Sequence, residues 1–260
     1  MIGSTDLSSK IINEFNNKYP NKIIYLKKKN GGLSDARNYA LPYVSGQYIG
    51  FVDSDDYVEL DMFEKMYNLA ITETLDLVEC NFIWEYPNKT KYDVGHKYLS
   101  SKDFFLFGRV MTCNKLFKTS IVKNNNLQFP FRLRYEDIEF FYKYISFVKK
   151  SNLIKKPFYH YIQRENSIIN KQNQKNEDVF NILDNIINFY KLNNLYDKYK
   201  SELEYLNIRF LLGSSFLRII KIKDKNIRKD LLNKTLNKLY NDFPNWKKNK
   251  YVKMHKLKEK

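Results

Sequence analysis

Apolar positions along the first two thirds of the chain alternate between a helical and a strand-like spacing. Helices are predicted where apolar residues recur every three or four positions, and strands where short apolar runs are rich in β-branched and aromatic residues. The predicted helices cover residues 4–20, 35–43, 60–72, 102–107 and 135–147, and the predicted strands cover 22–26, 48–52, 75–84 and 153–163, with a surface hairpin or loop at 86–95. This alternation favours an α/β fold with a mostly parallel sheet flanked by helices.

From about residue 173 the apolar pattern becomes helical throughout. Three packed helices are predicted there, at about 177–191, 196–221 and 224–241. We therefore place a boundary near residue 170. Residues 1–170 would form the α/β domain, residues 171–246 a C-terminal helical appendage, and residues 247–260 a basic, flexible tail.

The composition indicates a folded protein with a sizeable core, because 43% of the 260 residues are hydrophobic. No apolar run approaches the 18 residues of a membrane-spanning helix, and no basic segment followed by an apolar core marks a secretory signal. The two cysteines, Cys80 and Cys113, lie in apolar surroundings. We expect both to be buried thiols of a cytoplasmic protein.

The net charge of +16 is concentrated at the C-terminal end, where residues 218–260 contain 15 Lys or Arg against 4 Asp or Glu. These cations are mostly Lys, whereas nucleic-acid-binding surfaces usually place Arg among aromatic residues, so we expect no nucleic-acid partner. Plain solubility is the first interpretation of the basic segment. The second is a peripheral contact with the anionic inner face of the cell membrane.

Four polar residues, Asp53-Ser54-Asp55-Asp56, follow directly on the apolar run 48–52. A buried strand that ends in carboxylates delivers them to the carboxyl edge of a sheet, where open α/β folds bind ligands. Carboxylates crowded this closely repel one another unless a cation lies among them, and a hard divalent metal shared with ligand phosphates is the usual answer. The alternative is a solvated loop that caps the next helix.

Several sequence pieces, in this order and at this spacing, carry a family resemblance. They are Gly3-Ser4-Thr5-Asp6, Gly32-Leu33-Ser34-x-Ala36-Arg37-Asn38, Gly46-x-Tyr48-Ile49-x-Phe51-x-Asp53-Ser54-Asp55-Asp56, Asn114-Lys115-Leu116-Phe117, Tyr135-Glu136-Asp137 and Tyr159-x-Tyr161-x-x-Arg164-x-x-Ser167. Together they resemble the family 2 glycosyltransferases, which are nucleotide-sugar enzymes of the GT-A fold. The resemblance runs from Gly3 to about Ser167.

The resemblance implies a role for each acid. The donor would be a nucleoside diphosphate sugar, most simply a UDP-sugar, with Asp55 as ligand to Mg²⁺ or Mn²⁺ and Asp53 facing the ribose and diphosphate. Asp137 would be the general base that takes the proton of the acceptor hydroxyl. Glu136 would orient Asp137 or that hydroxyl. A single displacement would invert the anomeric configuration, while the metal stabilises the leaving group.

Two arginines complete the expected site. The resemblance implies a donor contact for Arg37 and an approach to the diphosphate for Arg164. A salt bridge to a neighbouring acid remains an equal alternative for Arg37, and a surface role for Arg164. The expected activity is transfer of a sugar to a saccharide or lipid-linked acceptor in the synthesis of a bacterial cell-surface polysaccharide or glycolipid.

One departure from the family pattern concerns the start of the chain. The family domain normally begins with a strand, a helix and a second strand before Gly-Ser-x-Asp, whereas here only Met1-Ile2 precede Gly3. We therefore expect residues 1–170 to be an N-terminally truncated GT-A domain whose first strand lacks neighbours. The alternative functions are an inactive fragment and a non-catalytic partner subunit of another transferase. The sequence does not identify the sugar, the acceptor or the linkage.

Overall fold

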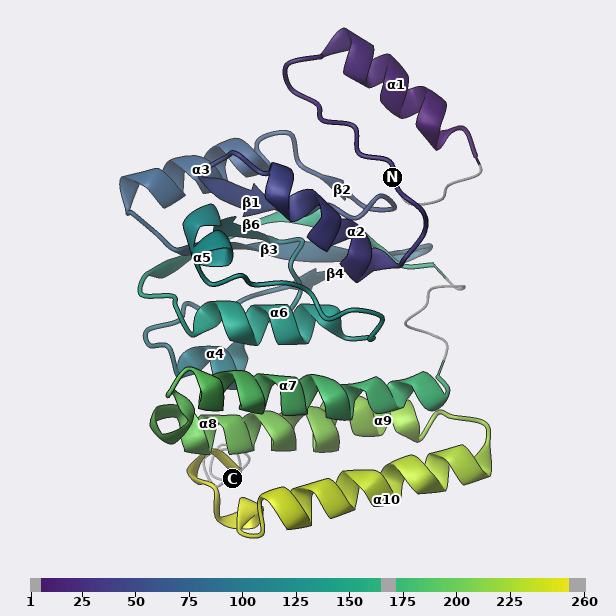
Figure 1. Ribbon diagram of the computed structural model, residues 1–260, viewed down its shortest axis with the longest axis vertical. Coiled ribbons are helices and arrows are strands. Elements are labelled where there is room, and N and C mark those ends of the chain that lie inside the picture. The colour runs from purple at the N-terminus through teal and green to yellow at the C-terminus, as the bar shows by residue number, and fades with distance from the viewer. Residues whose placement is uncertain (1–5, 165–171, 253–260) are drawn as a thin grey trace.

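A computed structural model describes residues 6–164 and 172–252, and within them the strands form one six-stranded sheet (Figure 1). The strands run in the order β1-β5-β3-β6-β2, and β4 pairs with the second half of β3. Their bounds are Tyr48–Gly50 (β1), Tyr57–Val58 (β2), Leu77–Tyr86 (β3), Lys89–Asp93 (β4), Lys115–Lys118 (β5) and Ser151–Ile162 (β6).

The directions of these strands correct the expectation of a mostly parallel sheet. Only the β3–β6 ladder is parallel, whereas β1–β5, β2–β6, β3–β4 and β3–β5 are antiparallel. Residues 22–26, predicted as a strand, form none, and Ile24 is 65% exposed. A strand needs a neighbour for its backbone N–H and C=O groups, and in the described part of the chain β1 is paired on one side only.

β3 is the central strand of the sheet, and its mostly apolar sequence suits a strand that is covered on both faces. Leu77 packs into the core on one face of the sheet and Val78 into the core on the other. Helix α3 (Met62–Thr72) covers the Val78 face through Met62, Met66 and Ala70. The other face is covered by α6 (Glu136–Ile145), α4 (Asp103–Phe107) and α5 (Thr119–Asn124). Cys80 and Cys113 are free, buried thiols, as predicted.

Helix α6 is buried on nearly all sides because it lies between the sheet and a further helical layer (Figure 1). The Tyr190 hydroxyl of that layer donates a hydrogen bond to the Tyr142 carbonyl of α6. The layer and its continuation consist of α7 (Asp178–Leu192), α8 (Tyr196–Arg209), a π-helical segment (Phe210–Ser214), α9 (Ser215–Ile219) and α10 (Lys225–Asp242). Within residues 6–164 and 172–252, no helix combines the length and apolar character needed to cross a membrane.

Two expectations about the C-terminal half fall partly outside the described residues. The boundary near 170 lies within residues 165–171, and residues 253–260 of the tail are likewise not described. Within tail residues 247–252, Asn249 and Tyr251 are buried, whereas the three lysines are exposed. Tyr251 is buried and its hydroxyl hydrogen-bonds to the buried carboxylate of Glu202 on α8.

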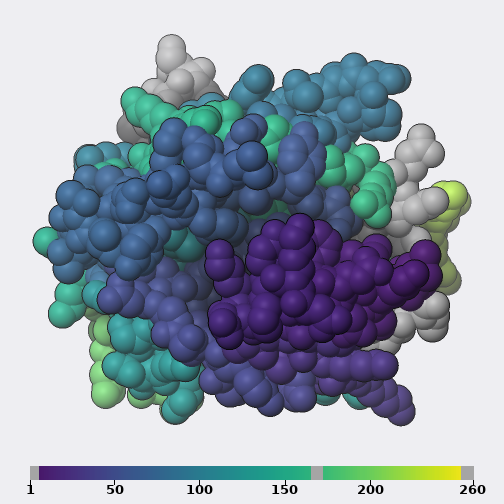
Figure 2. Space-filling view, turned by 90° about the horizontal axis from the view of Figure 1, so that it is seen from above, coloured from purple at the N-terminus to yellow at the C-terminus, as the bar shows by residue number. Residues whose placement is uncertain are grey.

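The N-terminal helix α1 (Ser8–Lys18) forms at the predicted place but buries none of its residues. Its apolar stripe faces outward, with Ile11 51% and Phe15 52% exposed. Figure 2 shows this segment, in purple, lying on the outside of the molecule. Helix α2 (Leu33–Ala40) and the short 3-10 helix Leu41–Tyr43 follow, and Leu41 enters the core on the α6 side.

Candidate active site

A single buried arginine joins the acids of the expected site. Arg37, on α2, is 8% exposed and forms ion pairs with three carboxylates. Its Nη2 lies 2.9 Å from Asp53 Oδ1, in the loop after β1, and its Nη1 lies 2.6 Å from Asp137 Oδ1, on α6. Nη1 also lies 3.7 Å from Glu136 Oε1. The structure therefore places the expected donor-side acid and the expected base pair around one guanidinium.

Aromatic packing fixes the position of Arg37. Its guanidinium carbon lies 5.5 Å from the ring centroid of Phe51 and 5.0 Å from that of Phe129. The neighbouring Asn38 exchanges two hydrogen bonds of 2.8 Å with the backbone of Phe129, so it holds the chain segment beneath the arginine. Burial opposes the charged form of Arg37, but Asp137, Asp53 and Glu136 outweigh it, and the pKa of Arg37 is raised.

Burial also shifts two of the carboxylates toward the neutral form. The pKa of Asp53 is raised by burial, which outweighs the lowering by Arg37. Burial, followed by repulsion from Asp137, raises the pKa of Glu136 to about 7, against the opposing pull of Arg37. At neutral pH Glu136 therefore carries a proton for part of the time and can donate a hydrogen bond from its carboxyl group.

Tyr159 anchors the acidic loop to β6. Its hydroxyl, on a fully buried side chain, accepts a hydrogen bond from the Asp53 backbone N–H at 3.1 Å and donates one to Asp56 Oδ2 at 2.7 Å. The Ile162 N–H donates to Asp56 Oδ1 at 2.9 Å. Both carboxylate oxygens of Asp56 are therefore used to hold the acidic loop against β6. Tyr159 opens the Tyr159-x-Tyr161 motif, but the sequence pattern predicted no role for its hydroxyl.

Asp55 differs from its neighbours because its carboxylate is exposed and, within the described residues, forms no hydrogen bond or ion pair. Arg164, from the end of β6, donates from Nη2 to the Asp55 backbone carbonyl at 3.4 Å, so the two expected residues are brought together. No group of three or more His, Cys, Asp or Glu in the described residues could hold a metal by itself. An exposed carboxylate fits a hard divalent cation that takes its remaining ligands from phosphate oxygens and water.

Thr112 is a contact of Asp137 that sequence reasoning missed. This fully buried residue donates from its backbone N–H to Asp137 Oδ2 at 3.3 Å and from its hydroxyl to Asp137 Oδ1 at 3.2 Å. The preceding carbonyl, of Met111, accepts a hydrogen bond of 2.7 Å from the buried Lys115 ammonium, which also pairs with Glu79 at 3.3 Å. Lys115 of the Asn-Lys-Leu-Phe motif thus supports the backbone behind the base. The Asn-Lys-Leu-Phe motif is the one feature of the sequence that could have pointed to this neighbourhood of Asp137.

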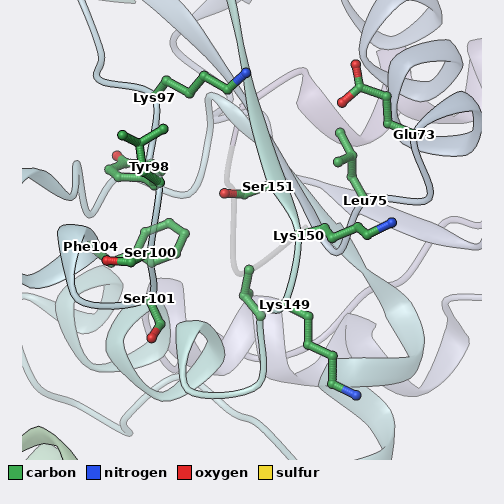
Figure 3. A pocket seen from close by; sticks show the side chains of 12 residues that line it. Glu73, Leu75, Lys97, Tyr98, Ser100, Ser101, Phe104, Lys149, Lys150 and Ser151 are labelled. Atoms are coloured by element: carbon green, nitrogen blue, oxygen red, sulfur yellow. The ribbon is translucent and has the colours of Figure 1, made fainter.

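A pocket of about 410 Å³ lies elsewhere, at the opposite edge of the sheet, where β3 and β6 begin (Figure 3). It contains none of the expected site residues. Its lining includes Lys97, Lys149 and Lys150, but Figure 3 shows the Lys149 and Lys150 side chains diverging, with the Lys97 nitrogen far from both. The charges in this pocket do not converge, so it offers no built site for an anion.

Comparison with solved structures defines the fold class. The crystal structure of Staphylococcus aureus TarS in complex with UDP-GlcNAc superposes with a TM-score of 0.68 at 20% identity, covering 91% of this chain and 70% of that one. TarS is named as a poly(ribitol-phosphate) beta-N-acetylglucosaminyltransferase. The chain has the α/β GT-A fold of these glycosyltransferases, as predicted.

Comparison of sequences defines the family. Residues 3–124 match the family model for glycosyl transferase family 2. EpsH of Bacillus subtilis (strain 168), whose name describes a glycosyltransferase, is 30% identical over 216 residues, which are 78% of this chain and 62% of EpsH. The minor teichoic acid biosynthesis protein GgaB of the same organism is 33% identical over 186 residues, 68% of this chain and 21% of GgaB. The chain belongs to glycosyltransferase family 2, and it spans less than two thirds of the length of these two relatives.

Proposed function

We propose that this chain is a metal-assisted, inverting glycosyltransferase that moves a sugar from a UDP-sugar to a saccharide or lipid-linked acceptor. One observation carries the proposal: Arg37 joins Asp53 to Glu136 and Asp137 at the sheet edge where Asp55 presents an uncommitted carboxylate. A transferase needs donor-binding and proton-accepting groups within one site, and this arrangement supplies both.

On the donor side, Asp55 would hold Mg²⁺ or Mn²⁺ together with diphosphate oxygens. Such a cation, when bound, neutralises the charge that develops on the leaving diphosphate. Asp53 faces the ribose and diphosphate, and its position is fixed by Arg37 and by the Tyr159 hydroxyl. Arg164, already beside the Asp55 backbone, reaches the diphosphate from the end of β6. The UDP-GlcNAc complex of TarS supports a UDP-sugar as the donor class.

On the acceptor side, Asp137 takes the proton of the attacking hydroxyl. Arg37 and Thr112 hold the Asp137 carboxylate in place, so its orientation is set before the acceptor arrives. Glu136, partly protonated at neutral pH, donates a hydrogen bond to the acceptor or orients the base. Attack from the face opposite the leaving group inverts the anomeric carbon in one step.

The setting that we propose is the synthesis of a bacterial cell-surface polysaccharide or glycolipid. The teichoic acid protein GgaB and the poly(ribitol-phosphate) transferase TarS, as named, support an acceptor of that class. Residues 1–170 would form the catalytic GT-A domain and residues 171–246 its helical appendage. The protein would act in the cytoplasm, with the basic segment 218–260 resting on the anionic inner face of the membrane. No nucleic-acid partner is proposed.

The test is hydrolysis of UDP-sugars, and transfer to saccharide and lipid-linked acceptors, with and without Mn²⁺ or Mg²⁺. Asp55→Ala should abolish the metal dependence, and Asp137→Ala should retain UDP binding while transfer falls at least about a hundredfold. The matched control is Asp230→Ala, because Asp230 is an exposed acid on α10 that pairs only with Lys234 among the described residues. Wild-type protein that binds neither UDP nor metal would refute the proposal.

A second candidate is a non-catalytic partner subunit, and the outward-facing apolar stripe of α1 favours it. An apolar face whose side chains are about half exposed is suited to rest on another protein chain. This candidate predicts that wild-type protein shows no donor hydrolysis under any metal condition. It also predicts that the chain raises the activity of a second transferase, and that Phe15→Glu abolishes this effect.

A further inference from the structure

The loop of residues 130–135 touches the site at both of its ends. Phe129, just before the loop, packs against the Arg37 guanidinium, and Glu136 and Asp137, just after it, form ion pairs with the same group. Any shift of this loop therefore changes how the two carboxylates meet Arg37. The conformation of the loop is part of the geometry of the site.

The loop holds an unfavourable backbone conformation. Arg132 and Tyr135 both adopt the left-handed region, with φ of 58° and 68°. For a residue with a side chain this conformation costs about 1 kcal/mol or more, so it persists only where the surroundings fix it. Tyr135 is the residue immediately before α6, and its backbone sets the direction in which Glu136 and Asp137 leave the loop.

The contacts that fix this loop come from the C-terminal helical layer. The Arg134 N–H donates to Asp178 Oδ2, on the first residue of α7, at 2.9 Å. The guanidinium of Arg218, on α9, lies 5.0 Å from the ring centroid of Tyr135. Figure 1 shows the start of α7 and α9 at the same end of the molecule as the loop before α6.

The π-helical segment between α8 and α9 sets the face that Arg218 presents. It spans Phe210–Ser214, and Gly213 within it has φ −100° and ψ −107°, outside the helical range. One additional residue in a helical turn rotates everything that follows by about 100°. Arg218 therefore points along a direction that an uninterrupted continuation of α8 would not give it. π-Helical turns of this kind are frequent at functional sites.

We propose that Asp178 and Arg218 are positioning residues, which hold Tyr135 in its left-handed conformation and thereby aim Glu136 and Asp137 at the acceptor. The inference rests on the proposed function for the role of the two carboxylates. Neither residue touches the reacting groups. The helical appendage therefore contributes to the geometry of the site, because two of its side chains contact the loop that leads into the base on α6.

The experiment combines hydrogen exchange with kinetics on the full chain. In Arg218→Ala and Asp178→Ala, amide exchange in peptides covering 130–138 should rise about tenfold, while exchange in β3 stays unchanged. The matched control is Arg228→Ala, since Arg228 lies on α10 and its side chain hydrogen-bonds only to the Ile222 carbonyl among the described residues. Transfer kcat should fall at least tenfold, with donor KM within twofold of wild type. Arg218→Lys, which retains a cation over the Tyr135 ring, should recover most of the kcat that Arg218→Ala loses.

Two outcomes separate a failure of this proposal from a failure of the proposed function. Exchange at 130–138 equal to that of the Arg228→Ala control in both variants overturns the proposal. A wild type without transferase activity overturns the proposed function alone, because hydrogen exchange still reports whether Asp178 and Arg218 hold the loop 130–135. If Arg218→Ala does not fold, Arg218→Met retains the apolar stem of the side chain, and the same rise in exchange is required of it.

Discussion

Arg37 Nη1 and Asp137 Oδ1 lie 2.6 Å apart, although the two residues are 100 positions apart in sequence. The same guanidinium pairs with Asp53 through its other terminal nitrogen. The carboxylate expected to face the donor and the carboxylate expected to act as base therefore share one cation. Substitution of either acid changes the environment of the other.

Arg37→Met should lower the free energy of unfolding by about 3 kcal/mol, because the substitution leaves Asp53, Glu136 and Asp137 partly buried without their common counterion. Urea denaturation at pH 7 measures the change. Arg228→Met, on α10, is the matched control and should stay within about 0.5 kcal/mol of wild type. A loss below about 1 kcal/mol for Arg37→Met would mean that solvent, not Arg37, balances these carboxylates.

Tyr159→Phe should loosen the acidic loop without disturbing the core. The lost hydroxyl links the Asp53 N–H to Asp56, so we expect a stability loss of about 1 kcal/mol. We also expect a severalfold rise in the Mn²⁺ concentration needed for half-maximal UDP binding, measured by calorimetric titration. Tyr161→Phe is the control, because the Tyr161 hydroxyl has no hydrogen bond to the described residues. Equal metal requirements for the two variants would contradict the anchoring role.

The pKa of Glu136, raised to about 7, makes stability depend on pH. A carboxyl group with a raised folded-state pKa stabilises the fold fully below its unfolded pKa near 4.5, and that contribution is lost as the pH rises through 7. The advantage of Glu136→Gln over wild type should therefore grow between pH 5 and pH 8, by about 2 kcal/mol. Thermal unfolding across this range measures it.

Glu64→Gln serves as the control for the pH experiment, since Glu64 is exposed on α3. Its unfolding temperature should track wild type across the same pH range. A pH-independent difference between Glu136→Gln and wild type would show that Glu136 ionises in the folded protein as it does in the unfolded chain.

The exposed stripe of α1 predicts a contrast between two apolar substitutions. Phe15→Ser should change the free energy of unfolding by less than about 0.5 kcal/mol, because the side chain is half exposed. Met66→Ala, on the buried face of α3, should cost about 2 to 5 kcal/mol. Denaturant unfolding of both variants gives the comparison. A loss above 1 kcal/mol for Phe15→Ser would reveal that another molecule covers α1 in solution.

The elements with strong local patterns were predictable from the sequence. β3 is mostly apolar, the second half of β6 is rich in aromatic residues, and α3, α6 and α7 carry clear helical stripes, so each formed at its predicted place. The failure at residues 22–26 has a non-local cause. A strand depends on its neighbours, and a run of β-branched residues does not show whether a neighbour exists. Strand direction is likewise a property of the whole sheet.

The site was predictable as a set of residues but not as a geometry. The strand that ends in acids indicated Asp53 and Asp55 as candidates, and the family resemblance added Asp137, Glu136 and the two arginines. The pairing of Arg37 with acids on both sides depends on how α2 meets α6, which no local pattern encodes. Thr112 and Tyr159 were missed for a related reason, because their roles come from hydroxyl groups that the fold turns toward the acids.

The charge around Arg37 has a consequence for the energetics of donor binding. One guanidinium faces three carboxylates there, and Asp55, in the same loop as Asp53, adds a fourth acid nearby. A diphosphate that enters this neighbourhood brings further negative charge to a region already short of positive charge. Binding must then be coupled to the uptake of a cation or a proton, and the partly protonated Glu136 marks where a proton can be stored. The metal would then act first as a counterion that reduces the electrostatic repulsion opposing donor binding, before any bond is broken.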